Sequence, residues 1–274
     1  MRYLILSDIH ANWEALEASL AAVEGRYDQI LCLGDIVGYG ADPNRCVEWV
    51  RDNCPNGRVV RGNHDKVCCG LDLGEDFNNT ALRAARWTQE QLTPENLEYL
   101  RALPQGPAAV TVAGPPVEPG LPPETPRDFI LVHGSPLDED EYLVSGTDAG
   151  MAFEHQAFRL TFFGHTHVQG GFIANPPVHD WWGHGSGARI IRMKNGPGIV
   201  KTTLELEESE KYLLNPGSTG QPRDGDSRAG LAIYDPDVRL LDYWRIPYDI
   251  EVAQARIIAA GLPEVLATRL QFGR

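Results

Sequence analysis

The polar residues of this 274-residue chain that could carry chemistry gather in five short segments, which hold five of its eight histidines. The segments are Asp8-Ile9-His10, Gly34-Asp35, Gly62-Asn63-His64-Asp65, His133-Gly134 and Gly164-His165-Thr166-His167. Carboxylate, amide and imidazole groups together suit Mn, Fe, Zn, Co or Ni ions better than Mg or an all-oxygen calcium site. The pattern therefore predicts a metal-dependent site built from these segments.

Two of the segments place potential ligands two residues apart. Side chains at that spacing in an extended chain lie on one side, roughly 6 to 7 Å apart, so Asp8 with His10 and His165 with His167 are expected to form two-pronged ligands. Two such prongs can hold two ions, and the metals of binuclear hydrolytic sites lie about 3.5 to 4 Å apart. A shared carboxylate keeps ions at that separation, and Asp35 is the candidate bridge.

The other three histidines have no ligand pattern beside them, so structural roles are expected for His155, His179 and His184. Five cysteines are an odd number at irregular spacing, which fits neither a secreted disulfide framework nor a paired zinc motif. We therefore expect reduced thiols. For the adjacent Cys68 and Cys69, metal binding or oxidation is the alternative to an ordinary place in a loop or core, since reactivity needs an exposed thiol of low pKa.

The elements that must position these segments alternate between strands and helices in the first third of the chain. Apolar runs bounded by polar turns predict strands over 2–7, 29–33 and 58–61. Helices are predicted over 13–25, from 43 to about 51 with Asp42 as N-cap, over 79–92 and over 94–102. Each chemical segment follows a predicted strand, and ligands in open α/β sheets bind outside the carboxyl ends of the strands.

The remainder of the chain is richer in strands. Six prolines within 113–127 predict a loop, because proline breaks helices and interior strands. Strands are expected over 129–132 and 160–163 around a helix over 147–159, and helices over 252–260 and 263–270 close the chain. Further strands are expected near 190–192, 200–206, 211–214, 231–234 and 239–245, with a β-rich insertion at about 174–210. This order indicates an α/β fold of two packed sheets flanked by helices, within a single domain spanning 1–274.

Composition restricts the partners. Lys and Arg number 24 against 38 Asp and Glu, a net charge of −14, so a polyanion meets repulsion and unspecific nucleic-acid binding is not expected. No apolar run approaches the roughly 18 residues of a membrane span, and the apolar start at 1–7 is too short for a signal-peptide core. We therefore expect a cytoplasmic protein without membrane attachment, and the sequence does not indicate an oligomeric state.

In order along the chain, the five segments resemble the five motifs of the calcineurin-like metallophosphoesterases. The similarity covers residues 1 to about 65 and 129 to about 167, and the β-rich part more loosely. The stretch 215–226, Asn-Pro-Gly-Ser-Thr-Gly-Gln-Pro-Arg-Asp-Gly-Asp, resembles the loop of a bacterial branch related to phosphodiesterases and diadenosine tetraphosphatases. That branch often has Gly where Ala11 stands, and a shorter link where 113–127 and 174–210 lie. The resemblance implies a four-layer α/β/β/α sandwich of two mixed sheets.

The resemblance also implies a ligand set for two transition-metal ions. Its members are Asp8, His10 and His167 for one ion, Asn63, His133 and His165 for the other, and Asp35 as the bridge. A water between the ions would become a hydroxide that attacks phosphorus in line. His64, outside the metal shell, would protonate the leaving oxygen or stabilise its charge, and Asp65 would help to order His64.

Three further residues are candidates for substrate binding. Arg223 could clamp a substrate phosphate through its guanidinium group, or it could form a surface ion pair with Asp224 or Asp226. Tyr39 and Asn12 follow the metal-bearing turns and could line the pocket, although a turn-stabilising role for the asparagine is the alternative.

The predicted function is hydrolysis of a small phosphate ester, with a phosphodiester or a nucleotide-like molecule favoured. A protein Ser/Thr phosphatase shares these motifs, but the acidic balance and the lack of an obvious peptide-binding module disfavour it. A metal-bound scaffold or regulator without turnover is the third interpretation. Loss of His64 or of a metal ligand would have favoured that interpretation, and all of them are present in the sequence.

Overall fold

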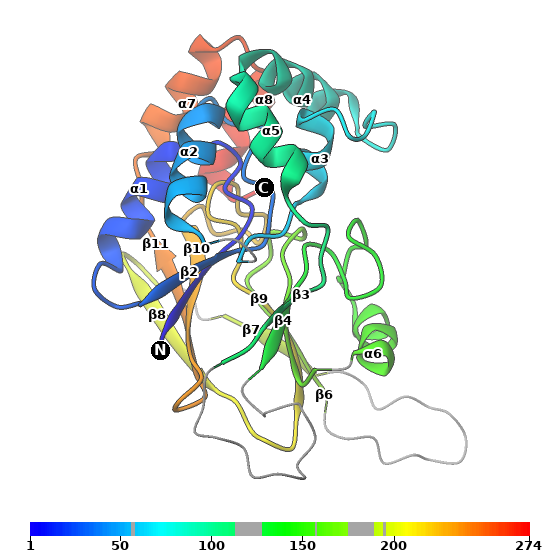
Figure 1. Cartoon of the computed structure of the whole chain (residues 1–274). Helices are drawn as coiled ribbons and strands as arrows, with labels where there is room; N and C mark the ends of the chain where they lie inside the picture. Colours follow the sequence, from blue (N-terminus) through cyan, green and yellow to red (C-terminus); the bar gives the residue numbers. More distant parts are fainter. Residues whose placement is uncertain (56–57, 113–127, 157, 175–188, 194–195) are drawn as a thin grey trace.

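Two mixed β-sheets pack face to face between helices in the computed structural model (Figure 1). The structure describes residues 1–55, 58–112, 128–156, 158–174, 189–193 and 196–274, with the side chain of Arg192 excepted. The first sheet has the order β2-β1-β10-β11-β8 and comprises β1 (Tyr3–Leu6), β2 (Gln29–Cys32), β8 (Val200–Glu205), β10 (Ala229–Asp235) and β11 (Leu240–Ile246). The second has the order β3-β4-β5-β9-β6-β7 and comprises β3 (Ala108–Val110), β4 (Phe129–Leu131), β5 (Leu160–Phe162), β6 (Gly170–Ala174), β7 (Arg189–Arg192) and β9 (Lys211–Asn215).

Helices lie on the outer side of each sheet. On the side of the first sheet, α1 (Trp13–Ala22) packs against β10 and β11, and the other helices join α1 directly or through one another. These are α2 (Pro43–Asn53), α3 (Asn63–Cys68), α4 (Asn79–Gln91), α5 (Pro94–Ala102), α7 (Ile250–Ala259), α8 (Glu264–Thr268) and the 3₁₀ helix η1 (Arg269–Phe272). On the opposite side, α6 (Gly146–His155) packs against β6 and β9 of the second sheet. The predicted sandwich of two mixed sheets flanked by helices is confirmed.

The alternation of side chains along β1 shows how the core forms. Successive side chains of a strand point to opposite faces of the sheet. Leu4 and Leu6 therefore pack among the helices, whereas Tyr3 and Ile5 pack between the sheets, where the ring of Tyr3 meets that of Phe129 edge-on at 5.5 Å. Because both faces are covered, this strand is an uninterrupted apolar run.

The parallel strand pairs carry the polar segments to one edge of the sandwich. β1 runs parallel to β2, and β5 runs parallel to both β4 and β9. Asp8 and Asp35 follow β1 and β2, while His133 and His165 follow β4 and β5. The strand ends of both sheets therefore contribute side chains to the same place.

The expected strand over 58–61 is wrong. A single bridge joins Val59 to Cys32, after which the backbone N–H of Arg61 donates to the carbonyl of Pro104. Gly62 then begins the turn into α3, so the chain leaves the edge of the sheet after one paired residue.

Other boundaries differ for local reasons. The helix expected over 147–159 ends at His155. Lys211 Nζ donates there to the carbonyl of Phe153, which a longer helix would have used, and to that of Gln156. The closing helix expected over 263–270 is α8 followed by η1. Three short elements, α3, β3 and β6, had no predicted counterpart because segments of three to six residues show no periodicity.

The predictions for the cysteines, for the histidines outside the five segments and for the proline-rich loop can be compared with the described residues. All five cysteines are free and buried, and burial raises the pKa of both Cys68 and Cys69, so neither is a reactive thiolate. His155 is exposed and its Nδ1 donates to the carbonyl of Met151 at 3.0 Å. The loop 113–127, His179 and His184 lie outside the described residues.

The predicted insertion at about 174–210 supplies strands to both sheets. Within its described part, β7 pairs with β6 of the second sheet, and β8 pairs with β11 of the first. Across the described residues, none of the helices combines the length and the apolar character that a membrane crossing needs.

Candidate metal centre

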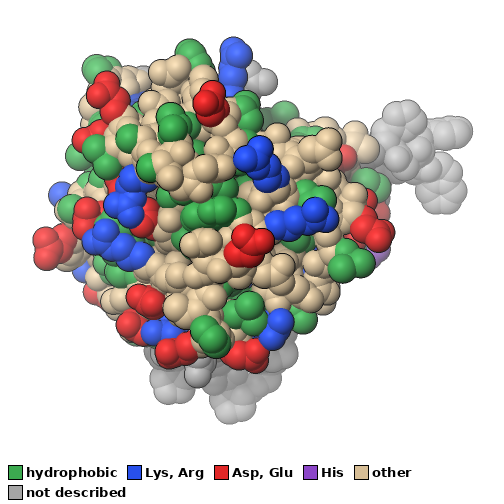
Figure 2. Space-filling view, turned by 90° about the horizontal axis from the view of Figure 1, so that it is seen from above, with side chains coloured by type: hydrophobic (Ala, Val, Ile, Leu, Met, Phe, Trp, Pro, Cys, Tyr) green, Lys and Arg blue, Asp and Glu red, His purple; other side chains and the backbone are tan. Residues whose placement is uncertain are grey.

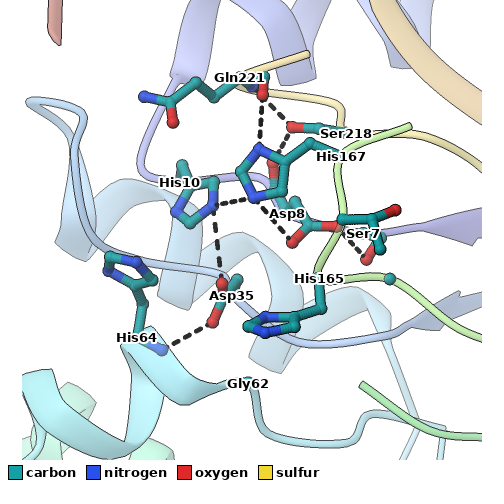
Figure 3. A network of polar contacts seen from close by, with 12 residues as sticks. Ser7, Asp8, His10, Asp35, Gly62, His64, His165, His167, Ser218 and Gln221 are labelled. Carbon is teal, nitrogen blue, oxygen red and sulfur yellow. Dashed lines mark hydrogen bonds and ion pairs between the residues drawn. The ribbon is translucent and has the colours of Figure 1, made fainter. Parts of the chain in front are cut away.

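The five polar segments converge on one buried cluster (Figure 3). Its members form two groups in which every residue offers a ligand atom within 4.8 Å of the others: Asp8, His10, Asp35 and His167, and Asp35, His133 and His165. All of these side chains are buried. Asp35 is common to both groups, which is the place that the sequence predicted for a bridging carboxylate.

Most of these residues adopt a backbone conformation that side chains rarely take. The angle φ is +52° for Asp8, +48° for His10, +52° for Asp35, +62° for His165 and +58° for His167. Such conformations cost on the order of 1 to 3 kcal/mol each and cluster at functional sites. The segments are therefore sharp turns rather than extended chain. The predicted two-pronged arrangement holds for Asp8 and His10, which belong to one group, whereas His165 and His167 belong to different groups, as the resemblance implied.

In the first group, ring nitrogens and carboxylate oxygens lie close together. His10 Nε2 lies 3.1 Å from His167 Nε2, and His167 Nε2 lies 3.2 Å from Asp8 Oδ1. Asp35 Oδ2 lies 3.6 Å from His10 Nε2. Ser7, which the sequence analysis missed, donates to Asp8 Oδ2 at 2.6 Å and so leaves Oδ1 toward the cluster.

The second group has a similar arrangement. His133 Nε2 lies 3.2 Å from His165 Nδ1 and 3.4 Å from Asp35 Oδ2. Asn63 Oδ1 lies 3.3 Å from His133 Nε2, which puts the predicted amide ligand beside the same nitrogen. Asp35 Oδ1 accepts from the backbone N–H of His64 at 2.8 Å, so Oδ2 is the oxygen that faces both groups.

The outer ring nitrogen of each cluster histidine contacts a backbone carbonyl. The contacts are His10 Nδ1 to Val37 at 3.0 Å, His133 Nδ1 to Leu33 at 2.7 Å, His165 Nε2 to Asp140 at 3.1 Å and His167 Nδ1 to Gln221 at 2.6 Å. A carbonyl can only accept, so the outer nitrogen carries the hydrogen and the inner nitrogen of a neutral ring presents its lone pair. In the pair of neutral rings His10 and His167, lone pairs that face each other at 3.1 Å repel unless a cation lies near both.

Burial and the two carboxylates set the charge of the cluster. Burial lowers the pKa of His10, His167 and His165, that of His165 to about 3, so these rings are neutral. Burial also opposes protonation of His133, but the Asp35 carboxylate outweighs it and raises the pKa of His133 to about 10. Burial acts to raise the pKa of Asp35, yet His133 holds that pKa well below its usual value. Ionised carboxylates thus favour positive charge here, and the donor set fits transition-metal ions.

Glycines in the motifs allow the turns to approach this closely. A Cβ on Gly62 would lie 2.1 Å from Asp35 Oδ1, and one on Gly164 would lie 2.1 Å from Ser7 Oγ. A Cβ on Gly34 would lie 2.4 Å from the backbone nitrogen of Gly62. These glycines adjoin the ligands in the sequence motifs, and the absence of a side chain makes room for those ligands.

His64 lies beside the cluster but outside both groups. Its ring is flanked by Tyr39 and Phe77, whose centroids are 4.2 and 4.5 Å away, and it meets the ring of His10 edge-on at 5.0 Å. Burial lowers the pKa of His64 to about 3. Its Nδ1 is buried without a hydrogen-bond partner among the described residues. This nitrogen faces the turn at Gly38, where a Cβ would lie 2.5 Å from it, so ring packing rather than hydrogen bonding holds the side chain.

Asp65 makes its hydrogen bonds to the backbone rather than to the His64 ring. Its Oδ1 accepts from Ile36 N at 2.9 Å and Val37 N at 3.2 Å, and its Oδ2 accepts from Gly62 N at 3.0 Å. Burial raises the pKa of Asp65 to about 7. The side chain ties the turn after β2 to the start of α3, and these three bonds do not include the His64 ring.

A pocket of about 290 Å³ adjoins the cluster. Four residues that the sequence predicted for the site line its wall: Tyr39, Asn63, His64 and His165. Tyr142, which the sequence analysis missed, also lines it and stacks on His165 with ring centroids 3.8 Å apart. The rest of the wall combines Phe77 with charged residues, among them Lys66, Asp72, Asp76 and Asp140.

Arg223 lies at the cluster together with Tyr39. Its backbone N–H donates to the carbonyl of His167 at 3.2 Å, and its guanidinium group donates to the hydroxyl of Tyr39 at 3.3 Å. The neighbouring carboxylates of Asp224 and Asp226 pair with other arginines. The alternative of a surface ion pair for Arg223 is therefore not formed within the described residues.

Asn12 lies behind the cluster and holds the turn after β1. Its Oδ1 accepts from Ala15 N at 3.1 Å and caps α1, and its Nδ2 donates to the carbonyl of Gly220 at 2.8 Å. Asn12 does not line the pocket described above. These contacts correspond to the turn-stabilising alternative for Asn12 rather than to substrate binding.

A family model described as calcineurin-like phosphoesterase matches residues 1–169, more than half of the sequence. The chain belongs to this family. An uncharacterized protein of Methanocaldococcus jannaschii is 35% identical over 277 residues, which cover 98% of this chain and 97% of that protein. A metallophosphoesterase from Sphaerobacter thermophilus is 39% identical with a TM-score of 0.78, covering 100% of this chain and 99% of the other. A hypothetical protein from Pyrococcus horikoshii is 18% identical with a TM-score of 0.72, covering 100% and 98%, and shares the fold. The buried Asp/His cluster is the candidate metal site of this metallophosphoesterase.

Proposed function

We propose that the protein hydrolyses a small phosphate ester at a centre of two transition-metal ions. The observation that carries the proposal is that two groups of buried ligand atoms share Asp35, and that each group contains a close pair of histidines, His10 with His167 and His133 with His165. Both pairs lie beside the same oxygen of Asp35, so a cation at each pair would share that carboxylate. One tetrahedral ion accepts four ligands, whereas this cluster and Asn63 offer seven.

The ligand assignment follows the two groups. Asp8, His10 and His167 would hold one ion, Asn63, His133 and His165 the other, with Asp35 between them. Mn, Fe, Zn, Co and Ni are the ions that this donor set suits. When bound, the ions supply positive charge for the phosphate and lower the pKa of a bound water so that it can act as the nucleophile. The protein's part is to orient each ring through its outer carbonyl contact and to hold Asp35 through the turn that Gly62 and Asp65 fix.

His64 is proposed to act on the leaving oxygen. Its ring is fixed between Tyr39 and Phe77 on the wall of the pocket, and its backbone N–H holds Asp35, so it lies beside a phosphate bound at the centre. The neutral ring can donate a hydrogen bond to the departing oxygen from there, and it can donate a proton once the negative charge of a bound phosphate raises its pKa. A positioned acid or base contributes roughly 10² to 10⁴ in rate.

The shape and charge of the pocket favour a small substrate. A volume of about 290 Å³ lies at the lower end of the usual range for small-molecule sites. Aromatic rings and carboxylates share its wall, which suits the uncharged base or sugar of a nucleotide-like ester better than an acidic phosphopeptide. Figure 2 shows basic and acidic side chains interleaved on the face above the helices, in line with the expectation that nucleic acid is not bound unspecifically.

Turnover of chromogenic esters by the metal-loaded protein tests the proposal. The protein is reconstituted with Mn and assayed on p-nitrophenyl phosphate, bis(p-nitrophenyl) phosphate and a phosphoserine peptide, with a metal-stripped sample as the control. We expect metal-dependent hydrolysis that is faster on the small esters than on the peptide. Faster turnover of the peptide would support the protein phosphatase instead. Binding of metal without turnover of any substrate would support the scaffold or regulator.

Two further predictions stand as proposals. A single domain over 1–274 is supported by the hydrophobic core that both sheets share. A cytoplasmic location is supported by the five free cysteines, because a reducing compartment keeps thiols in that state.

A further inference from the structure

Two arginines lie side by side next to the candidate metal centre. Arg223 and Arg269 both donate to Gln221 Oε1, the former at 3.2 Å. Both guanidinium groups lie over the ring of Tyr39, at 5.6 and 4.5 Å from its centroid. The Nε of each is buried and has no hydrogen-bond partner among the described residues. The pair therefore retains donors that nothing in the described chain satisfies.

Like charges this close are unfavourable without an anion. The carboxylates of Asp224 and Asp226, which follow Arg223 in the sequence, pair with other arginines. Burial lowers the pKa of Arg269 to about 10, and the charge of Arg223 adds to that effect. A phosphate group would offset the repulsion, because the planar fork of a guanidinium group matches phosphate oxygens.

The C-terminal segment is docked so that Arg269 reaches this place. The backbone N–H of Gly225 donates to the carbonyl of Gly273 at 3.0 Å, and a Cβ on Gly273 would lie 2.6 Å from the backbone of Asp226. Leu270 packs in the same buried cluster as Tyr39. The 3₁₀ helix η1 is therefore fixed on the loop that carries Arg223, which makes the two-arginine arrangement a built feature rather than a chance approach of surface side chains.

The ring of Tyr39 contacts both the metal-binding cluster and the arginine pair. Its centroid lies 4.7 Å from the ring of His10, and the Arg269 guanidinium lies 4.5 Å from it. The backbone N–H of Arg223 donates to the carbonyl of His167, whereas Arg269 contacts Tyr39 and Gln221. Arg223 is therefore joined directly to a cluster residue, and Arg269 is joined to the cluster through Tyr39 and Gln221.

We propose that Arg269, together with Arg223, binds a second phosphate group of the substrate beside the phosphoryl group that is hydrolysed. The substrate class is then a small molecule with two linked phosphate groups, such as a nucleoside diphosphate or a diphosphate-bridged diester. This inference rests on the proposed function, because it needs the first phosphate at the metal centre. Linked phosphates share one bridging oxygen, so the second group extends just beyond the first, toward the arginine pair.

The test compares one phosphonate with two. Methylphosphonate and methylenediphosphonate are titrated into the Mn-loaded protein by calorimetry, and both are measured as inhibitors of p-nitrophenyl phosphate hydrolysis. We expect the parent to bind the diphosphonate about tenfold more tightly than the monophosphonate, and Arg269→Gln to remove most of that preference. Arg269→Lys keeps the charge without the fork and should retain part of the preference.

Arg256→Gln is the matched control. Arg256 lies on α7, and its guanidinium group pairs with Asp42 and Glu14, so its loss removes the same charge away from the arginine pair. It should keep the diphosphonate preference of the parent. Equal loss in Arg256→Gln and Arg269→Gln would indicate a general effect of net charge and overturn the proposal, as would a parent protein without any preference. Absence of p-nitrophenyl phosphate hydrolysis in every metal-loaded variant would refute the proposed function instead, and the calorimetry would still test Arg269.

Discussion

Replacement of Gly62 by Ala tests whether the cluster depends on the close approach of two turns. A Cβ at this position would lie 2.1 Å from Asp35 Oδ1, 2.5 Å from Asp35 N and 2.7 Å from Asp35 Cγ. Ordinary contacts of a Cβ begin at about 3.4 Å, so the carboxylate or its turn must move by roughly 1 Å. The backbone of Gly62, with φ −103° and ψ 174°, is one that alanine adopts freely. The whole effect therefore comes from the displacement of Asp35.

A shift of this size at a group shared by two ions should be costly. Misplacement of a reacting group by about 1 Å lowers rates on the order of 100-fold. We expect Gly62→Ala to lower kcat/KM for p-nitrophenyl phosphate by about that factor and to reduce the metal content. Overpacking should also lower the free energy of unfolding by about 1 to 3 kcal/mol. Steady-state kinetics, elemental analysis and denaturant unfolding measure the three effects.

Gly150→Ala provides the control, because Gly150 lies inside α6 and a Cβ there meets no atom within 4 Å. It should raise the free energy of unfolding by about 0.5 to 1 kcal/mol and leave the metal content and kinetics unchanged. If Gly62→Ala binds as much metal as the parent and its kcat/KM stays within about threefold, Gly62 does not set the position of Asp35 and the reasoning is refuted.

Three other predictions concern the same cluster. The purified protein, reconstituted with excess Mn, should contain close to two metal equivalents by elemental analysis, and one ion or none would sink the binuclear assignment. Asp35→Asn should weaken both ions at once because the neutral amide removes the charge that the two share; if it kept two ions while His133→Ala lost both, the bridge would be wrongly placed. His64→Asn should keep the metal content of the parent while kcat falls by roughly 10² to 10⁴. That loss should be larger on alkyl esters than on nitrophenyl esters if His64 donates a proton, equal losses would indicate charge stabilisation, and loss of a metal equivalent would overturn its placement outside the metal shell.

The sequence predicted the starts of helices correctly where they depend on interactions between neighbouring residues. Pro94 after Thr93 predicted the start of α5, and Thr93 Oγ1 indeed accepts from Asn96 N at 3.2 Å. Asp42 before Pro43 predicted the start of α2, and the helix begins there although Asp42 makes no side-chain capping bond. The strand expected over 58–61 from its apolar residues does not form beyond a single bridge, because pairing at a sheet edge depends on where the chain runs next.

The chemistry of the site was also readable from residue types. Carboxylates, an amide and imidazoles at the ends of predicted strands indicated a metal centre, and the structure brings Asp8, Asp35 and His133 together as that pattern requires. The position of each residue directly after a predicted strand was enough to predict that they converge. Parallel strands bring their carboxyl ends to one edge of the sheet, and this does not depend on the details of packing.

The tertiary structure alone decided how the groups face one another. Asp8 and His10 fall in one group, whereas left-handed turns direct His165 and His167 into different groups, so a spacing of two residues did not by itself decide which group each side chain joins. The stacking of Tyr142 on His165 and the approach of Arg269 to Arg223 join residues that are far apart in the chain. Such contacts depend on how the loops and the C-terminal segment pack in the folded chain. The conformational preference of each short segment carries no information about which distant residues it will meet.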